Sequence, residues 1–500
     1  MNPALSFSLG LMMTLAGWGA ARAVAGAGLN RPVLILMHDG LVPLGTFFVI
    51  LMATGRPLLA GAIALGAFGG FAFADKVKRA VLREPIVFTD MSEVVELFRH
   101  PQFYLPFAGT GRVIAGSGLV VAAYAAILVA FRPVFLVSAE WSLSILLATL
   151  ALILFWAKGP LGFWARLLRG WRPNGDPLID ARRFGPFAMI GCYGIIARAE
   201  RQTRRAVAPA IGLGIKLAQK PPVILVQSES FFDVARLGLG EETLPAYHAS
   251  RGAGQWGRLS VPCWGANTTR TEFSVLTGLG QVEAGYDILN PYHAFTDRPV
   301  TSLARFFKNR GYRTVCIHPF DLSFYGRQRV MPLLGFDEVI GEGAFASAAG
   351  RRGYVTDAAV ADMVADLFAA ADRPLFVFVI SMENHGPWTQ GMALPGPLQI
   401  VRNANADDGL GDYLDTLRGA DAMIARLTAV LRQDGRNGLL GFYGDHMPSL
   451  PRAFAALGFD ERDTDYFLWR PKMPIGAQPP PRQDISAEAL PHALLTMLQS

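Results

Sequence analysis

Charged residues are scarce in this 500-residue chain, at 17% of the sequence. A soluble globular chain carries about 25%. The chain is also too long for one ordinary domain, because domains cluster at about 100–200 residues. Hydrophobic residues make up 51% of the sequence, and they concentrate before residue 157. These features exclude a uniformly soluble chain and predict a membrane part followed by a soluble part.

Cysteine is scarce as well. Cys192, Cys263 and Cys316 lie far apart and are odd in number, which excludes a zinc-finger spacing and a disulfide framework. A nucleic-acid-reading motif is also missing from the soluble part, so the net charge of +6 does not indicate a nucleic-acid partner. Much of the positive charge flanks the apolar runs instead, as is usual in membrane proteins.

Apolar runs close to bilayer-spanning length cover residues 4–21, 32–53, 57–74, 113–131 and 141–157. They predict a multi-span α-helical membrane domain over residues 1–157, with about five helices. The first run lacks the frame of a signal peptide, so we expect a retained anchor. His38 and Asp39 interrupt the second run, and ionisable residues inside a span mark either function or a helix end or kink. We expect a helix end or kink.

Basic residues load the third loop, from Lys76 to Arg112, and the segment from Lys158 to Arg172. With five spans both clusters fall on one side, and the positive-inside rule would then place the soluble part in the cytoplasm. Residues 83–107 carry apolar positions at helical spacing, which predicts an interfacial amphipathic helix. We expect residues 158–220 to form a juxtamembrane connector.

From residue 221 onward, short apolar runs alternate with helical patterns. Buried strands are predicted at residues 223–226, 314–317, 375–380 and 439–443, and helices at 300–310, 357–371 and 412–434. This alternation is typical of an α/β sheet with helices on both faces.

Polar residues follow each predicted strand: Glu229, His318, His385 and the pair Asp445-His446. Each alone would be read as a solvated loop residue. Ligands of open α/β sheets bind outside the carboxyl ends of the strands. The polar residues at the ends of four strands together therefore predict a site at one edge of the sheet. Carboxylates and imidazoles there suit a divalent cation of the manganese, magnesium or zinc type. The residues themselves do not choose among these metals.

A threonine pair, Thr268 and Thr269, lies just before the helical pattern of residues 272–279. A helix N-terminus favours phosphate, and a hydroxyl held beside a metal can act as a nucleophile. Threonines at this position can equally be simple N-caps. Residue types and spacing leave both interpretations open.

The soluble part resembles the alkaline-phosphatase (sulfatase-like) superfamily, and within it the branch of lipoteichoic acid synthases and phosphoglycerol transferases. The similar stretches occur in the family order: Val226-Gln-Ser-Glu229-Ser-Phe231, Asn267-Thr268-Thr-Arg-Thr-Glu-Phe-Ser-Val-Leu-Thr-Gly278, Gly311-Tyr-Arg-Thr-Val-Cys-Ile-His318-Pro319, Ser381-Met-Glu-Asn-His385-Gly-Pro-Trp388 and Tyr443-Gly-Asp445-His446. The stretch Leu82-Arg-Glu-Pro-Ile-Val-Phe-Thr-Asp90 of the membrane part is also similar to that branch.

The resemblance implies a role for each matching residue. Glu229, Thr268, Asp445 and His446 would be the metal ligands, with manganese expected before magnesium or zinc. Thr268 would also be the nucleophile, and His385 would contact the transferred phosphate. His318, Tyr325 and Arg327 would bind the head group, although the branch usually has tryptophan where this chain has Tyr325.

The implied function is metal-dependent transfer of a phosphoglycerol-type head group from a membrane phospholipid to an envelope glycan or glycolipid, through a phosphothreonine. The resemblance also implies that residues 221–500 form a catalytic domain outside the cytoplasmic (inner) membrane. This is the opposite side from the one that the loop charges favour. Two alternatives are a phosphoethanolamine transferase, a class that tends to carry several disulfides, and a non-catalytic envelope-binding domain. A sulfatase is disfavoured because Ser260-Val-Pro262-Cys-Trp264 lacks the arginine of the sulfatase motif.

Overall fold

The computed structural model describes residues 2–91, 109–131, 161–203, 211, 215–295, 300–345, 350, 352–472 and 480–499. The chain divides into two compact units, Met1–Arg205 and Ala206–Ser500. The predicted connector, residues 158–220, is therefore divided between the two units.

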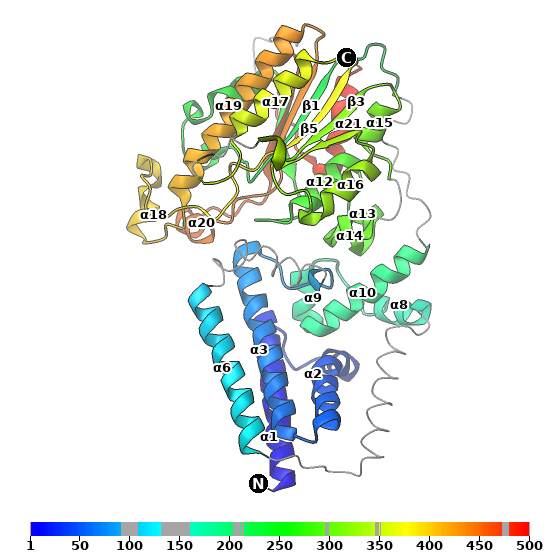
Figure 1. Ribbon diagram of the computed structural model, residues 1–500, viewed down its shortest axis with the longest axis vertical. Coiled ribbons are helices and arrows are strands. Elements are labelled where there is room, and N and C mark those ends of the chain that lie inside the picture. Colours follow the sequence, from blue (N-terminus) through cyan, green and yellow to red (C-terminus); the bar gives the residue numbers. More distant parts are fainter. Residues whose placement is uncertain are drawn as a thin grey trace. The chain divides into compact units, whose positions relative to one another are not determined.

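Among its described residues, the first unit contains four helices that are long and apolar enough to cross a membrane. They are α1 (Pro3–Ala25), α2 (Val33–Thr54), α3 (Pro57–Leu82) and α6 (Thr110–Ala130) (Figure 1). They correspond to the first four predicted runs. The fifth run, residues 141–157, lies outside the described residues, as does most of the predicted interfacial helix. The described residues of this unit also form α8 (Leu161–Arg169), α9 (Pro177–Phe184) and α10 (Pro186–Thr203).

Small residues let α1 and α3 touch along their backbones. The buried positions of α1 recur every three or four residues and include Ser6, Gly10, Thr14, Gly17 and Ala21. A Cβ added at Gly10 would lie 2.2 Å from the carbonyl oxygen of Pro57. Membrane helices associate through such small-residue stripes, because lipid provides no hydrophobic drive between helices.

Asp39, in the second turn of α2, is fully buried and has a defined set of partners. Its Oδ2 accepts hydrogen bonds from Arg22 of α1 at 2.6 Å and from Trp18 Nε1 at 2.7 Å. Its Oδ1 accepts the backbone N–H groups of Phe187 and Ala188, both at 2.9 Å. These N–H groups belong to the first turn of α10, so Asp39 caps this helix from a different helix.

Gly185 must be a glycine for this cap to form. Its φ is +97°, and a Cβ there would lie 2.4 Å from the Asp39 carboxylate. The ionisable pair of the second run thus lies inside α2, one turn before Pro43, and Asp39 joins α1, α2 and α10.

The second unit is built on one eight-stranded sheet. Its strands are β1 (Val223–Ser228), β2 (Gln255–Ser260), β3 (Arg313–Ile317), β4 (Glu338–Ile340), β5 (Leu375–Ile380), β6 (Leu439–Gly444), β7 (Thr464–Trp469) and β8 (Ile485–Ser486). Their order is β4-β3-β5-β1-β6-β7-β2-β8. The first five strands in that order are parallel, whereas β7 runs antiparallel to its neighbours. The four strands expected from the sequence are β1, β3, β5 and β6, and they are adjacent.

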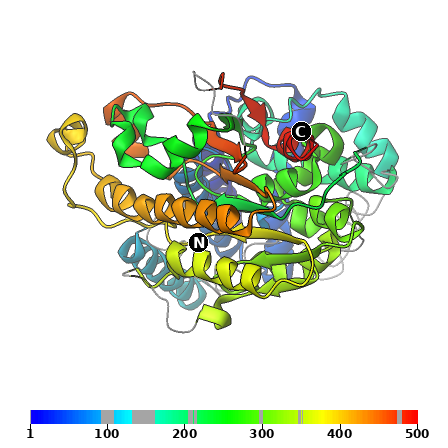
Figure 2. The ribbon, with the colours of Figure 1, turned by 90° about the horizontal axis from the view of Figure 1, so that it is seen from above.

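Helices cover both faces of this sheet, as predicted. The α-helices are α11 (Pro245–Gly252), α12 (Thr268–Thr277), α13 (Gln281–Ala284), α14 (Pro291–Ala294), α15 (Leu303–Lys308), α16 (Arg327–Leu334), α17 (Asp357–Ala369), α18 (Gln399–Asn403), α19 (Leu410–Asp434), α20 (Pro451–Leu457) and α21 (Leu490–Met497). On one face α17 and α19 lie side by side (Figure 2). On the other, Phe307 of α15 stacks on Phe376 of β5 at 4.6 Å.

Continuous apolar runs in the central strands explain why both faces of the sheet are buried. Ile224 and Val226 of β1 join the core that α17 and α19 cover, while every residue of β1, β5 and β6 is buried. Strands buried on both faces carry continuous apolar runs. The predicted order, apolar helices followed by an α/β sheet, is confirmed.

We expect Asp39→Ala to destabilise the first unit strongly. The change leaves the buried guanidinium of Arg22 without its carboxylate and removes the acceptor of two α10 N–H groups. Breaking a buried pair from one side costs about 3–5 kcal/mol. The thermal unfolding midpoint of the detergent-solubilised chain, followed by tryptophan fluorescence, measures this loss.

The matched control is Glu200→Ala on α10. The carboxylate of Glu200 is 3.7 Å from Arg169, which is half exposed, so this change should cost less than about 1 kcal/mol. Equal midpoints for the two variants would show that Asp39 does not hold the unit together.

Candidate active site

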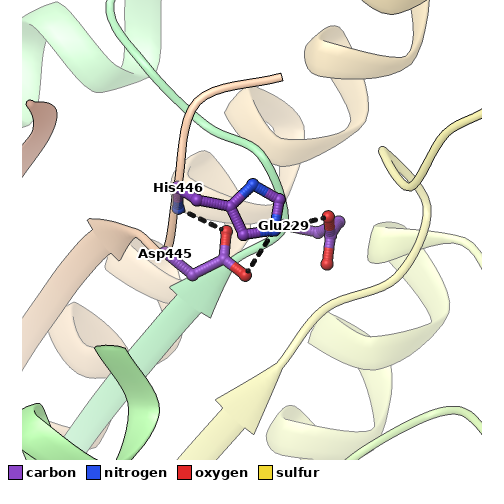
Figure 3. A group of neighbouring side chains, drawn as sticks. All are labelled: Glu229, Asp445 and His446. Carbon is purple, nitrogen blue, oxygen red and sulfur yellow. Dashed lines mark hydrogen bonds and ion pairs between the residues drawn. The ribbon is translucent and has the colours of Figure 1, made fainter. Parts of the chain in front are cut away.

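Three potential metal ligands meet at the carboxyl ends of β1 and β6. Glu229 follows β1, and Asp445 and His446 follow β6. The two strands pair in parallel with Ser228 opposite Gly444, so the next residues of both strands emerge together. His446 Nε2 lies 3.5 Å from Glu229 Oε1 and 3.4 Å from Asp445 Oδ2 (Figure 3). One ligand atom from each residue lies within 4.8 Å of the others.

Gly444 permits this close approach. A Cβ at this position would lie 1.9 Å from the carbonyl oxygen of Phe231. Any larger residue at the end of β6 would therefore push the strand away from the loop that follows β1. The glycine in Tyr443-Gly-Asp445-His446 is required by the packing of the site.

Hydrogen bonds orient the ligand atoms toward a common point. Asp445 Oδ1 accepts the backbone N–H groups of Ser230 and His446, both at 2.9 Å, whereas Oδ2 is buried and accepts none from the described residues. His446 Nδ1 lies 2.9 Å from the carbonyl oxygen of Met447. The Nδ1 proton therefore faces that carbonyl, and Nε2 faces the carboxylates, where it offers a lone pair once its own proton has left. An orphaned carboxylate oxygen and an imidazole lone pair fit a divalent cation.

The electrostatics of this cluster agree with a cation site. Burial, opposed by His446 and reinforced by Glu229, raises the pKa of Asp445 to about 7. Burial lowers the pKa of His446, but the carboxylates of Asp445 and Glu229 outweigh it and raise that pKa overall. Like charges packed in a buried space retain protons near neutral pH, and a metal ion must displace them.

Thr268 is the first residue of α12 and lies next to this cluster. Its Oγ1 is 3.4 Å from His446 Nε2. Thr268 is partly exposed, whereas Thr269 is buried. The residue before the helix is Asn267, with a left-handed φ of +65°, and its side chain forms no cap. Neither threonine is the N-cap, so the simple capping interpretation does not describe this helix start.

The segment after β5 holds Glu229 in place. Ser381 Oγ accepts the Glu229 N–H at 3.1 Å, and Asn384 Nδ2 donates to the Glu229 carbonyl at 3.2 Å. His385 lies in the same segment, with Nδ1 2.6 Å from the Gly386 carbonyl and 3.3 Å from Tyr354 OH. No role was predicted for Ser381 and Asn384, although the Ser381–Trp388 stretch carries the family resemblance. The signal available for them in the sequence was their position directly after a buried strand.

His318, Tyr325 and Arg327 lie close together, and two of them are deeply buried. Arg327 NH1 is 3.1 Å from His318 Nε2, and its Cζ lies 5.4 Å from the centre of the Tyr325 ring. Arg327 also donates from Nε and NH2 to the carboxylate of Glu272, at 3.3 and 2.9 Å. Glu272 was not predicted to belong to the site. The signal available in the sequence was a carboxylate on an otherwise apolar helix face, because such a carboxylate needs a buried counter-charge.

Comparisons with known proteins match the chain to one family and to several relatives. A sequence model of the family described as Sulfatase matches residues 221–499. A capsular polysaccharide biosynthesis protein, RkpI, of Rhizobium meliloti (strain 1021) is 32% identical over 470 residues, which are 87% of this chain and 80% of that protein. A putative cyclic beta-1,2-glucan modification protein of the same organism is 27% identical over 245 residues, 48% of this chain and 38% of its own.

One solved structure matches both units. It is the integral membrane lipooligosaccharide phosphoethanolamine transferase A (EptA) of Neisseria meningitidis, with a TM-score of 0.56 and 13% identity. The match covers 99% of this chain and 95% of that chain. At this identity the likeness establishes a shared fold.

We expect the affinity for Mn²⁺ to fall as the pH is lowered through about 7. Protons on Asp445 compete with the metal, so the dissociation constant should rise about tenfold between pH 8 and pH 6 for each proton displaced. Isothermal titration of the full-length solubilised chain at pH 6, 7 and 8 measures this dependence.

Asp445→Ala should abolish bound metal in elemental analysis. Asp362→Ala, which removes an exposed carboxylate of α17, is the control and should bind normally. A pH-independent affinity, or full metal content in Asp445→Ala, would remove Asp445 from the site.

Proposed function

Because the chain belongs to the sulfatase family, we propose that it transfers a phosphoglycerol-type head group from a membrane phospholipid to a cell-envelope glycan or glycolipid. The observation that carries this proposal is the hydroxyl of Thr268 at the start of α12, 3.4 Å from His446 in the ligand cluster. Membership of this family confirms the predicted superfamily, which contains both phosphotransferases and sulfatases. Sulfate-ester chemistry is disfavoured because Trp264 stands where the sulfatase motif requires arginine.

Glu229, Asp445 and His446 would hold one divalent ion, with Thr268 as the fourth ligand and manganese expected before magnesium or zinc. When bound, such an ion lowers the pKa of a neighbouring hydroxyl and neutralises charge on phosphorus. Two features support this arrangement: the unpaired Asp445 Oδ2 and the Nε2 lone pair of His446.

In the proposed reaction, Thr268 Oγ1 loses its proton and bonds to the phosphorus of the lipid donor. The bond from phosphorus to the diacylglycerol oxygen breaks, and that oxygen takes up a proton. An acceptor hydroxyl then attacks the phosphothreonine, gives up its proton and restores Thr268. His385 would donate to non-bridging oxygens as charge develops, the effect that dominates phosphoryl transfer.

His318, Tyr325 and Arg327 would bind the head group. Their mutual contacts, on the loop and helix that follow β3, support a shared role. The acceptor class is supported by the names of the two Rhizobium relatives, a capsular polysaccharide biosynthesis protein and a putative cyclic beta-1,2-glucan modification protein. A polysaccharide and a glucan are both glycans, and both present hydroxyl groups.

The four apolar helices support an integral membrane protein of the cytoplasmic membrane. Anchoring beside the bilayer raises the local concentration of a lipid donor. We propose that the second unit lies outside the cytoplasm, where envelope glycans are found, although the basic loops alone would favour the opposite side.

A reporter joined after Ser500 tests this orientation. An alkaline phosphatase fusion, which is active only outside the cytoplasm, should be active, and a β-galactosidase fusion at the same residue should be inactive. The reverse pair of activities would place the second unit in the cytoplasm.

Thr268→Ala should abolish cleavage of fluorescent phosphatidylglycerol. A nucleophile is needed only for chemistry, so kcat should fall by about 10³-fold or more, while metal content and folding are retained. Thr269→Ala is the matched control and should lose at most a modest factor. Lipid turnover is read as fluorescent diacylglycerol, and the phosphorylated residue is identified by peptide mass spectrometry.

A phosphate adduct on Thr269, or activity retained in Thr268→Ala, would refute the assignment of the nucleophile. Faster cleavage of phosphatidylethanolamine than of phosphatidylglycerol by the wild type would refute the assignment of the head group.

A further inference from the structure

Glu272 lies at the centre of a buried polar cluster behind the start of α12. Its carboxylate accepts hydrogen bonds from Gln227 of β1, Tyr292 of α14 and Arg327 of α16. Glu272 is fully buried, and each of these three donors is at most 2% exposed. Three elements that are distant in sequence thus converge on one carboxylate of the helix that carries Thr268.

The described residues that form hydrogen bonds with the Glu272 carboxylate are all donors, and one of them is a cation. Arg327 uses Nε and NH2 on this carboxylate, a two-pronged geometry typical of strong charge-assisted pairs. Neither charge reaches solvent, so each is balanced by the other. Glu272 therefore cancels the charge of Arg327 inside the protein.

His318 completes this neutral arrangement. A guanidinium can only donate, so the contact with Arg327 NH1 makes His318 Nε2 an acceptor and leaves the ring proton on Nδ1, 3.5 Å from the Ile380 carbonyl. Burial first, and then Arg327, hold the pKa of His318 well below its usual value. The end of β3 therefore presents a neutral imidazole beside a neutralised guanidinium.

This cluster is close enough to Thr268 to act on a bound ester. Glu272 follows Thr268 by four residues on α12, which is about 6 Å along the helix axis. A single unbalanced charge at that distance, in a region without solvent, is weakly screened and changes binding substantially.

We propose that Glu272 determines the charge of the head group that the site accepts, by cancelling Arg327 and so favouring an uncharged, hydroxylated group. Glu272 acts through Arg327 and does not touch the ligand. The inference rests on the proposed function for the position of the head group beside His318, Tyr325 and Arg327. It goes further in naming the residue that sets the preference.

Ligand binding to the full-length, detergent-solubilised, Mn²⁺-loaded protein tests this proposal without requiring turnover. Isothermal titration compares three phosphate monoesters: glycerol phosphate with a neutral head, phosphoethanolamine with a cationic head, and phosphoglycolate with an anionic head. The wild type should bind glycerol phosphate most tightly.

The single variants should shift the preference in opposite directions. Glu272→Gln leaves Arg327 unbalanced, so affinity for phosphoglycolate relative to glycerol phosphate should rise at least about tenfold. Arg327→Gln leaves Glu272 unbalanced, so relative affinity for phosphoethanolamine should rise by a similar factor. The double variant Glu272→Gln with Arg327→Gln is neutral again, and its ratios should return to within about threefold of the wild type.

A buried carboxylate elsewhere separates this effect from general destabilisation. Asp465 of β7 is also buried and is paired with Arg236 and Arg258, so Asp465→Asn should lower thermal stability without changing the affinity ratios. Should one single variant fail to fold, the other single variant and the double variant still decide the question.

Each outcome has one meaning. Equal losses for all three esters in the single variants, or a double variant that departs from the wild-type ratios, would overturn the role of Glu272. A wild type that binds phosphoethanolamine best would overturn the phosphoglycerol assignment and the preference for an uncharged group, whereas opposite shifts in the variants would still support control of charge selectivity by Glu272. Absence of binding of all three esters to the wild type would overturn both.

Discussion

Ligand side chains from two strands can meet only when the strands are neighbours in the sheet and in matching register. In this protein the parallel pairing of β1 with β6, with Ser228 opposite Gly444, satisfies both conditions. Glu229 and the pair Asp445-His446 then leave the sheet at the same level. The other features of the site lie at the same edge of the sheet. Ser381 and Asn384, which follow β5, hold Glu229, and α12 begins where Thr268 reaches His446.

Two buried carboxylates outside the candidate metal site, one in each unit, are balanced within the chain. In the first unit Arg22 and two backbone N–H groups satisfy Asp39, and in the second Arg327 satisfies Glu272. The ligand cluster differs, because it brings two carboxylates and an imidazole together and leaves Asp445 Oδ2 without a hydrogen bond from the described residues. This contrast distinguishes the candidate cation site from the Asp39 and Glu272 pairs, which are complete within the chain.

The sequence was sufficient for four strands of the second unit, for α15, α17 and α19, and for the residues that follow those four strands. Continuous apolar runs located β1, β3, β5 and β6, because strands buried on both faces have no alternation to conceal them. The polar residues after β1 and β6 located the cluster of Glu229, Asp445 and His446. The pairing of Glu272 with Arg327 and of Asp39 with the α10 backbone was not predicted, since these partners lie 55 and 148 residues away and no local periodicity records such contacts. Strand order was likewise not encoded by any single segment.

The two halves of the Asp39 cluster belong to different stages of synthesis. Arg22 and Asp39 are 17 residues apart, on α1 and α2, whereas the N–H groups of α10 are synthesised about 150 residues later. The helices α1 and α2 therefore contain a matched cation and anion and can enter the bilayer as a hairpin of no net charge at this position. The later synthesis of α10 completes the hydrogen bonding of Asp39, so α10 joins a carboxylate already in place.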